Sequence, residues 1–187
     1  MRQQIDRYLQ EVADNISRLP REPIERLIDE LTRARDCGAR VFIFGNGGSA
    51  ATASHMACDL SKNATREGAS RIRAVALCDS IPTLTAYAND DGYETVFNEQ
   101  LLTQAEPGDV AVAISGSGNS PNVLRAVETA KRMGLTIVGI TGGSGGALRT
   151  LVDICIMSPS PRMDQIEDCH LVIDHVVTAV LKGHPDQ

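Results

Sequence analysis

The chain is poor in aromatic residues: its 187 residues include three Tyr, three Phe and no Trp. Proteins that bind single-stranded nucleic acid stack bases on aromatic side chains, so this composition argues against such a partner. The formal net charge of -6 also argues against general binding to a phosphate backbone. A single phosphate group can still be bound, because backbone N–H groups and helix N-termini hold anions without net positive charge. We therefore expect no nucleic-acid partner.

The sequence also lacks paired cysteines and long apolar runs. Its five cysteines are widely spaced with no Cys-x-x-Cys pair, which is typical of free thiols in a reducing compartment. No apolar run approaches the roughly 18 residues that a membrane-spanning helix needs, and the first residues contain no apolar signal core. These absences predict a cytoplasmic protein with no membrane partner.

Two amphipathic helices are predicted ahead of the first strand. Apolar residues recur at three- and four-residue steps in residues 4–19 and again in residues 23–37, and Gly38 follows as a stop signal. This N-terminal extension, residues 1–38, has no other local element to cover. We expect its helices either to bundle with a second subunit or to pack on the sheet of their own chain.

Short apolar runs alternate with helical stretches over the rest of the chain. Five runs are predicted strands, at residues 40–44, 73–77, 109–114, 135–140 and 153–157. Helices are predicted at residues 50–63, 81–88, 94–105, 120–133, 146–151 and 164–182. Continuously apolar strands are buried on both faces, and their alternation with helices indicates a parallel sheet. The predicted fold is a three-layer, doubly wound, flavodoxin-like α/β sandwich with a five-stranded parallel sheet. It forms a single domain, residues 1–187, with its α/β core at residues 39–182.

The loop after the third strand is the strongest candidate for binding a ligand, because open parallel sheets bind ligands beyond the carboxyl ends of their strands. It spells Ser115-Gly116-Ser117-Gly118-Asn119-Ser120 and precedes a helix. Its three hydroxyls suit the three outer oxygens of a phosphate monoester, and the helix dipole favours an anion there. An ordinary turn with a helix cap is the alternative, but that would need fewer serines.

Two other loops are rich in glycine. The first strand ends in Gly45-Asn46-Gly47-Gly48-Ser49, where glycine permits close approach to an anion and Ser49 can cap a helix or donate to a phosphate. Its spacing matches neither the Walker P-loop nor a complete dinucleotide-binding fingerprint, so a tight turn without ligand is the alternative. We interpret residues 141–146 as a flexible turn outside the site.

Residues able to move protons gather on two helices. His55 and Asp59, four residues apart, share one face of the helix after the first loop. In the last helix His175 falls among apolar residues, on a face that we expect to be buried. A histidine there is more often a core residue than a ligand. Another face of the last helix carries Glu167, His170 and Asp174.

Several separated motifs occur in the order found in one known family. They are Gly45 to Ser49 with His55, Ala88-Asn89-Asp90 with Gly92-Tyr93, Gly108-Asp109 leading into Ile114 to Ser120, Thr141-Gly142 with Gly145-Gly146, and Ile166 to His170 with His175. Together they resemble the sugar isomerase (SIS) domain family, in particular its phosphoheptose isomerases. The resemblance implies an aldose–ketose isomerase that converts sedoheptulose 7-phosphate to a D-glycero-D-manno-heptose 7-phosphate through an enediol, for bacterial heptose and surface glycan biosynthesis.

The resemblance also implies roles for individual residues. Substrate and phosphate binding carries over to Asn46, Gly47, Gly48, Ser49, Asn89, Asp90, Ser115, Gly116, Ser117, Ser120, Asp164 and Glu167. Zinc is the implied cofactor, and its implied ligands are His55, Asp59, Glu167 and His175. Asp59 is the implied catalytic base and His175 the implied acid. The implied assembly is a homotetramer.

Three positions depart from the family's usual residues: Asp59 replaces a glutamate, Glu167 a glutamine and Gly116 a threonine. Aspartate and glutamate both bind zinc, so the implied ligands remain chemically suitable. A base displaced by about an ångström can nevertheless suit another substrate. The alternatives are therefore an isomerase for a different phosphosugar, and a non-catalytic SIS-domain protein that senses a phosphosugar or binds a partner.

The spacing in the last helix raises a geometric difficulty. Glu167 and His175 are eight residues apart, roughly 12 Å along a helix at about 1.5 Å per residue. Both side chains reach one metal ion only if Glu167 lies on a frayed helix start. The alternative is that the two polar clusters meet across a subunit contact, and we expect the site to lie at such an interface.

Overall fold

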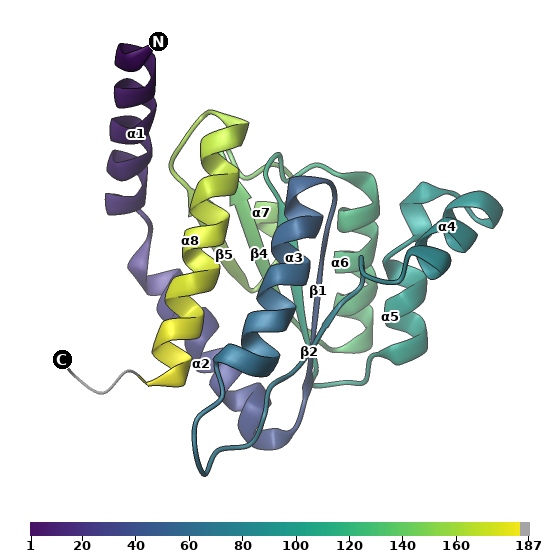
Figure 1. Ribbon diagram of the computed structural model, residues 1–187. Helices are drawn as coiled ribbons and strands as arrows, with labels where there is room; N and C mark the ends of the chain where they lie inside the picture. The colour runs from purple at the N-terminus through teal and green to yellow at the C-terminus, as the bar shows by residue number, and fades with distance from the viewer. Residues whose placement is uncertain (184–187) are drawn as a thin grey trace.

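The computed structural model describes residues 1–183 and has a central parallel sheet with helices on both faces (Figure 1). The strands are β1 (Arg40–Gly45), β2 (Arg73–Ala76), β3 (Val110–Ser115), β4 (Thr136–Gly142) and β5 (Ile154–Ser158). All pairings are parallel, and the strand order is β2-β1-β3-β4-β5. This is the flavodoxin-like order, whose switch point lies between β1 and β3. The predicted α/β fold class is confirmed.

Helices form the two outer layers. They are α1 (Arg2–Ser17), α2 (Arg21–Cys37), α3 (Gly48–Cys58), α4 (Ile81–Asp90), α5 (Asn98–Gln104), α6 (Pro121–Met133), α7 (Leu148–Leu151) and α8 (Met163–Lys182). A π-helical turn, η1 (Asp59–Asn63), continues α3, and a 3-10 turn, η2 (Tyr93–Thr95), precedes α5. The predicted helix at 94–105 is thus divided in two. The other predicted helices and strands lie within a few residues of their observed bounds.

The apolar strand residues serve two separate cores. Along β1, Val41 and Ile43 enter the core beneath α2, α3 and α8, whereas Phe42 and Phe44 enter the core beneath α5 and α6. All four side chains are completely buried. Alternate side chains point to opposite faces of a strand, so a strand covered on both faces must be apolar throughout. This is why the continuous apolar runs predicted the layered fold correctly.

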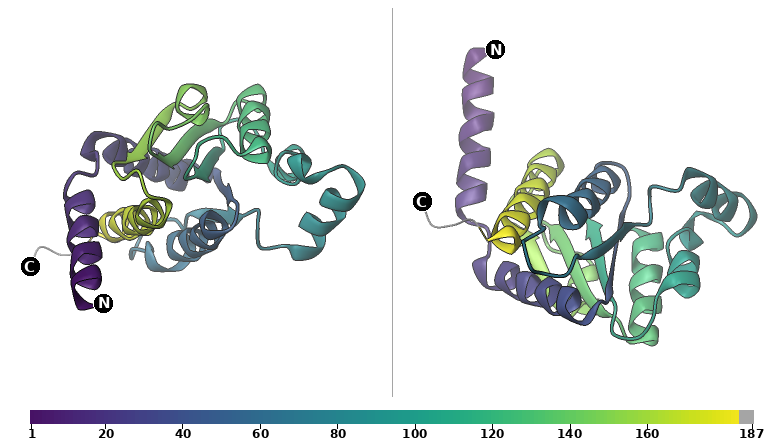
Figure 2. Two further views of the ribbon diagram at one scale, coloured as in Figure 1. Left: turned by 90° about the horizontal axis from the view of Figure 1, so that it is seen from above. Right: turned by 60° about the horizontal axis from the view of Figure 1, so that its bottom comes forward.

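The two N-terminal helices behave differently from each other. Helix α2 packs on the sheet, with Leu27 and Leu31 completely buried. Helix α1 stands beyond the body of the molecule beside α8 (Figures 1 and 2). Within residues 1–183, no helix combines the length and apolarity needed to cross a bilayer. The alternative of packing on the sheet of its own chain therefore holds for α2, and bundling with a second subunit stays a prediction for α1.

Candidate active site

The loops after β1 and β3 lie side by side at the switch point of the sheet. Gly45 pairs with Ile114, and a Cβ atom at Gly45 would lie 2.5 Å from the Ile114 carbonyl oxygen. Only glycine permits this close approach. The side-chain amides of Asn46 and Asn122 exchange hydrogen bonds of 2.8 and 2.9 Å. The glycine-rich first loop and the start of α6 are thereby joined into one surface.

The serine loop, residues 115–120, is a closed turn in which the hydroxyls of Ser115 and Ser120 face each other. The Gly118 N–H donates to the Ser115 carbonyl oxygen at 3.0 Å, and the Ser115 and Ser120 hydroxyl oxygens lie 3.2 Å apart. Ser117 is exposed. Ser120 is the N-cap residue of α6, yet its side chain makes no capping hydrogen bond. The Ser120 hydroxyl is therefore not used for capping, which weakens the alternative of an ordinary turn with a cap.

The loop after β4 supports the serine loop. The Leu148 N–H donates to the Gly118 carbonyl oxygen at 3.0 Å, and the Ala147 N–H donates to the Asn119 side chain at 2.9 Å. A Cβ atom at Gly146 would lie 2.5 Å from the Ser117 carbonyl oxygen. The glycines of residues 141–146 therefore allow two loops to pack together, which the interpretation as a free turn did not anticipate.

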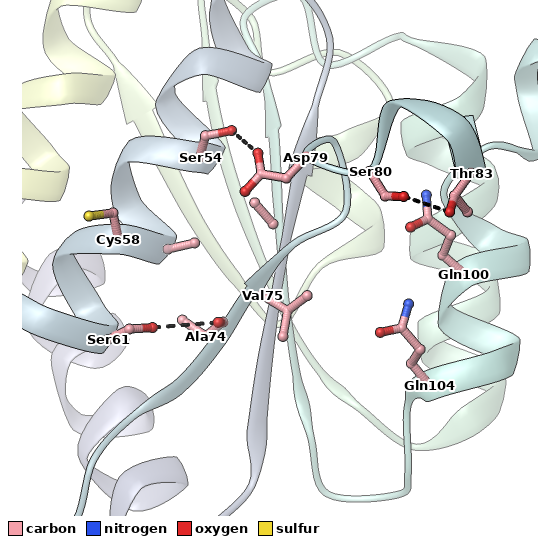
Figure 3. A pocket seen from close by; sticks show the side chains of 12 residues that line it. Ser54, Cys58, Ser61, Ala74, Val75, Asp79, Ser80, Thr83, Gln100 and Gln104 are labelled. Carbon is pink, nitrogen blue, oxygen red and sulfur yellow. Dashed lines mark hydrogen bonds between the residues drawn. The ribbon is translucent and has the colours of Figure 1, made fainter. Parts of the chain in front are cut away.

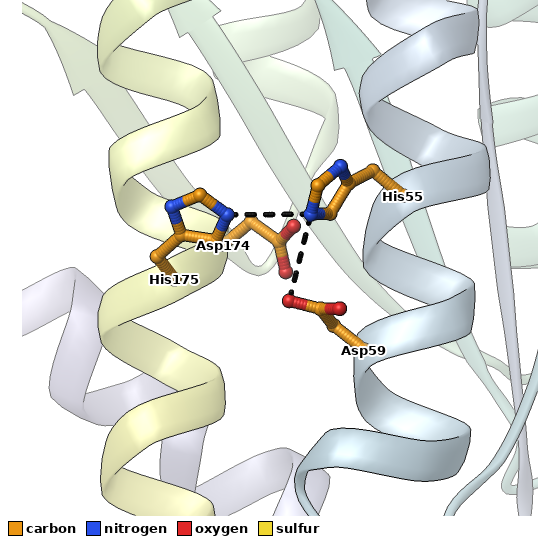
Figure 4. Close-up of side chains that lie close together, drawn as sticks. All are labelled: His55, Asp59, Asp174 and His175. Atoms are coloured by element: carbon orange, nitrogen blue, oxygen red, sulfur yellow. Dashed lines mark hydrogen bonds and ion pairs between the residues drawn. The ribbon is translucent and has the colours of Figure 1, made fainter.

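Two histidines and two aspartates from α3, η1 and α8 lie close together (Figure 4). One ligand atom from each of His55, Asp59, Asp174 and His175 lies within 4.8 Å of all the others. The Nε2 atoms of His55 and His175 are 3.3 Å apart, and His55 Nε2 lies 3.6 Å from an Asp59 oxygen. The other Asp59 oxygen accepts a 2.7 Å hydrogen bond from Asn63 at the end of the π-helical turn. We call these four residues the His/Asp cluster.

The position of the His/Asp cluster bears on two predictions. Helices α3 and α8 are neighbours, so His55, Asp59 and His175 meet within one chain, and a subunit interface at the substrate site stays a prediction. The faces of α8 are also reversed: His175 is exposed, whereas His170 and Asp174 are each 1 % exposed. The physical reason is that α8 packs on the sheet through another apolar stripe, which consists of Ile166, Cys169, Ile173, Val177 and Leu181.

Asp174 is in an unusual electrostatic environment. Burial and, after it, the charge of Asp59 raise the pKa of Asp174 to about 7, an increase that His55 and Thr178 partly offset. Within the described chain neither Asp174 oxygen has a hydrogen-bond partner of normal geometry. A buried carboxylate is unfavourable unless it is neutralised or compensated by a cation. Imidazole and carboxylate are both zinc ligands, so the cluster fits a metal ion chemically.

Glu167, the other predicted metal ligand on α8, lies elsewhere. A Cβ atom at Gly48 would be 2.5 Å from each Glu167 carboxylate oxygen, which puts this carboxylate against the first turn of α3. Ser49, the next residue of α3, is buried. Glu167 is therefore grouped with the first loop rather than with the His/Asp cluster.

Comparison with known proteins identifies the family. The SIS domain family matches residues 6–142, from α1 to the end of β4. The chain belongs to the SIS domain family. Phosphoheptose isomerase of Rhodospirillum rubrum is 36 % identical over 184 residues, which cover 97 % of each protein. That of Mycobacterium tuberculosis strain H37Ra is 44 % identical over 150 residues, covering 80 % of this chain and 76 % of the relative.

A solved structure agrees with these sequence matches. Phosphoheptose isomerase from Neisseria gonorrhoeae superposes with a TM-score of 0.90 at 28 % identity, and the match covers 98 % of this chain and 99 % of the other. The resemblance to the phosphoheptose isomerase branch of the SIS family is thus confirmed.

Three other predicted residues lie at the margins of the site. Asn89 and Asp90 end α4, which has no buried residue and extends away from the sheet (Figure 1). Asn89 donates to Asp90 at 2.7 Å, and both side chains are exposed. Asp164 begins α8 and accepts a 2.6 Å hydrogen bond from Arg162, which lowers the pKa of Asp164. The hydrogen bonds of the described residues do not connect these three side chains to the serine loop or the His/Asp cluster.

The remaining predicted residues are glycines, and two polar residues were missed. Gly47 immediately precedes α3 with a φ of +57°. Gly116 lies beneath the start of α8, where a Cβ atom would be 3.3 Å from the Met163 methyl carbon.

The residues that the sequence analysis missed are Asn122 and Tyr93, and the Tyr93 hydroxyl donates to Asn46 at 2.9 Å. Both occur in or beside motifs of the sequence, but only the fold shows that they converge on Asn46.

A cavity of about 650 Å³ lies on another side of α3, between β2 and helices α4 and α5 (Figure 3). Its polar lining includes Ser54, which donates to Asp79, and Gln100. None of the residues predicted for the SIS-family site lines it. One side of α3 therefore faces α8 and contributes to the His/Asp cluster, and another side faces β2 and lines this cavity.

Proposed function

We propose that the protein is an isomerase that interconverts sedoheptulose 7-phosphate and D-glycero-D-manno-heptose 7-phosphate, a sugar of bacterial surface glycans. The observation that carries the proposal is that α3 starts at the phosphate-binding loops and leads to the His/Asp cluster. His55 lies seven residues after Gly48, or roughly 10 Å along the helix. This separation allows a sugar phosphate to bind at one end and react at the other. The names of relatives that are 36–44 % identical support the same chemistry.

The serine loop is the proposed phosphate site. Ser115, Ser117 and Ser120 would donate from their hydroxyls, and the N-terminus of α6 would favour the anion. The first loop, residues 46–49, borders this site through the Asn46–Asn122 pair. The sugar contacts proposed by resemblance are Asn89, Asp90, Gly116, Asp164 and Glu167. The exposed position of α4 means that Asn89 and Asp90 would contact a sugar only if α4 moves or another subunit supplies this pair.

The proposed chemistry is proton transfer at the far end of the sugar. Asp59 would take a proton from the carbon beside the carbonyl group, and His175 would give a proton to the carbonyl oxygen, which leaves an enediol. The reverse transfers at the neighbouring carbon and oxygen complete the isomerisation. Asn63 holds one Asp59 oxygen at 2.7 Å and so fixes the carboxylate. A well-positioned general base or acid contributes about 10²–10⁴-fold to the rate.

Zinc is the proposed cofactor. The donors present fit this ion, because two imidazoles face each other beside a buried carboxylate that has no other partner. His55, Asp59 and His175 would hold it. When bound, zinc would polarise the sugar oxygens and offset the negative charge that develops in the enediol. The cytoplasmic location and the single-domain organisation stay predictions.

The test of the proposed function is incubation of the purified protein with sedoheptulose 7-phosphate, with and without zinc, while both sugars are followed by NMR. We expect interconversion, with a higher rate in the presence of zinc. If no conversion occurs but the sugar phosphate still raises the melting temperature, the chain is a phosphosugar sensor instead. Conversion of other phosphosugars alone would point to the remaining alternative.

We also infer that the chain associates with copies of itself through α1. Ile5 and Leu9 on this helix are 53 % and 61 % exposed. A groove of about 440 Å³ continues the apolar surface over α1, α2 and α8, and is lined mainly by Ile16, Leu19, Ile24, Ile28, Val172, Val176 and Val180. An apolar stripe of this extent is typical of a protein interface. Because the stripe includes a projecting helix, a second copy with the same helix is the proposed occupant, and a homotetramer the proposed assembly.

A further inference from the structure

Two contacts fix how α3 and α8 lie beside each other. At the start of both helices the Glu167 carboxylate lies against Gly48, and further along His55 Nε2 is 3.3 Å from His175 Nε2. His55 follows Gly48 by seven residues, and His175 follows Glu167 by eight. The helices therefore run in the same direction, and the two contacts are about two turns, roughly 10–12 Å, apart. In this arrangement Glu167 is too far along α8 to join the two histidines.

Asp174, unlike Glu167, lies beside the two histidines. It is 1 % exposed, neither carboxylate oxygen has a hydrogen-bond partner of normal geometry in the described chain, and one of these oxygens lies within 4.8 Å of the ligand atoms of His55, Asp59 and His175. Asp59 differs, because Asn63 already binds one of its oxygens. Removing a carboxylate from water without a partner is strongly unfavourable. A bound cation would compensate the Asp174 charge.

The two imidazole rings are spaced for a shared ion. Zinc–nitrogen bonds of about 2.0–2.1 Å in a tetrahedral arrangement put two ligand nitrogens about 3.3–3.4 Å apart. The observed Nε2–Nε2 distance is 3.3 Å. The rings are also inclined at 62° rather than stacked, so both nitrogens can point to a common centre. The cluster thus provides two nitrogens at the right separation and an adjacent carboxylate that lacks a partner.

We propose that Asp174, rather than Glu167, completes the metal-binding set with His55, Asp59 and His175. Helix α8 then supplies two adjacent ligands to the ion, and the Glu167 carboxylate remains against Gly48 at the first loop. The proposal rests on the metal site of the proposed function, but not on the identity of the sugar. It can therefore be tested with metal alone.

The direct test is zinc affinity measured by calorimetry on metal-free protein without sugar, with cobalt absorption as a second probe. Loss of hydrogen-bonded partners outside the ligand set usually costs 10–100-fold in metal affinity, so Asp174→Asn should weaken zinc binding by about 100-fold or more. Glu167→Ala should change the affinity less than about threefold. Asp168→Asn is the matched control, because Asp168 is on the same helix but binds Tyr8 at 2.7 Å.

Stability of the metal-free protein separates a ligand from a structural residue. Asp174→Asn removes a buried charge that has no partner, so the metal-free variant should melt at the same temperature as the wild type or higher. Zinc should then raise its melting temperature much less than that of the wild type, because ligand binding stabilises in proportion to affinity. A structural role would instead lower the melting temperature without metal and leave the zinc-induced shift intact.

Two results would overturn the proposal. One is zinc affinity that is lost in Glu167→Ala and retained in Asp174→Asn; the other is a wild-type protein that binds neither zinc nor cobalt. Failure to convert sedoheptulose 7-phosphate would leave it standing, since the binding experiment contains no sugar. The failure of the proposed function and that of the Asp174 assignment are thereby distinguished.

Discussion

At the residue scale, the two carboxylates of the His/Asp cluster have different surroundings. Asp59 is 8 % exposed and bound by Asn63, whereas Asp174 is 1 % exposed without a partner. A base must reach a carbon-bound proton, so it needs a fixed orientation and access to substrate. Asp59 meets both needs better than Asp174. On the proposed function, Asp59 is therefore the residue that transfers the proton, and Asp174 is the residue whose charge balances that of the metal ion.

Replacing Asp59 with Asn should lower kcat by about 10²–10⁴-fold, because the amide cannot accept the proton. Binding of the sugar phosphate, measured by calorimetry, should change little, because the proposed phosphate contacts lie about two turns away along α3. Asp6→Asn, on an exposed part of α1, is the matched control. Unchanged turnover in Asp59→Asn would rule out its role as base.

Ser120→Ala tests the phosphate site at one hydroxyl. Hydrogen bonds to charged groups are worth about 1.5–3 kcal/mol, so the variant should bind the sugar phosphate roughly 10–100-fold more weakly. Its melting temperature should change little, because the Ser120 side chain makes no capping hydrogen bond. Ser17→Ala, on the exposed end of α1, is the control. A large loss of stability with unchanged binding would instead indicate a cap.

At the element scale, α8 shows what the sequence could and could not predict. The bounds of α8 and of the buried strands were predictable, because apolar runs and glycine stops are local signals. Its buried face was not, because the stripe Val172, Val176, Val180 is as apolar as the stripe Ile166, Ile173, Val177. Only packing against α3 and the sheet decides between them. Asp174 was therefore missed as a member of the cluster, and the helical pattern alone put His175 on a buried face, although the family resemblance implied a metal ligand there.

Helix α3 and its π-helical extension carried a clearer sequence signal. His55 and Asp59 are one helical turn apart in a segment that directly follows a glycine-rich loop, so their shared face was predictable. The serine loop was predictable for the same reason: its residues are contiguous. By contrast, the Asn46–Asn122 pair joins residues 76 apart in sequence, and no local pattern reports such a contact.

His170 gives α8 a pH-dependent attachment to β4. Its Nε2–H donates to the Thr141 carbonyl oxygen at 3.2 Å, and burial lowers the His170 pKa from 6.5 to about 4. Between these values the unfolded chain binds more protons than the folded one, so this contribution is intact above pH 6.5 and is lost as the pH falls. At pH 5 the loss is about 2 kcal/mol.

The measurement is urea unfolding of the wild type and His170→Gln at pH 7 and pH 5. The glutamine can still donate to Thr141 but does not titrate, so the variant should gain about 2 kcal/mol relative to the wild type at the lower pH. Asp174 titrates in the opposite sense, and comparing the two proteins cancels its effect. Parallel stability changes in both would contradict a buried neutral His170.

At the scale of the whole molecule, the proposed assembly surface and the proposed metal site are separate. The His/Asp cluster forms within one chain, whereas the apolar stripe of α1 faces outward. Tyr8 and Asn15 on α1 bind Asp168 and Gln165 at the start of α8. Assembly through α1 would therefore affect the start of α8, near Gln165 and Asp168, rather than the His/Asp cluster further along this helix.

Ile5→Glu with Leu9→Glu should dissociate the proposed oligomer, because two charges would enter an apolar contact. Sedimentation should then report a smaller species that still binds zinc with wild-type affinity. Gln3→Glu with Gln4→Glu adds the same charge at exposed positions of the same helix and should leave assembly intact. Loss of zinc binding on dissociation would show that the metal site needs a second subunit after all.

The most direct test of the central claim is NMR of sedoheptulose 7-phosphate incubated with the zinc-loaded protein in deuterated water. A base that removes the proton beside the carbonyl group exchanges it with solvent through the enediol. The account predicts formation of the heptose 7-phosphate with deuterium at that carbon, and loss of both signals in Asp59→Asn. A sugar phosphate that binds, but neither isomerises nor incorporates deuterium, would contradict it.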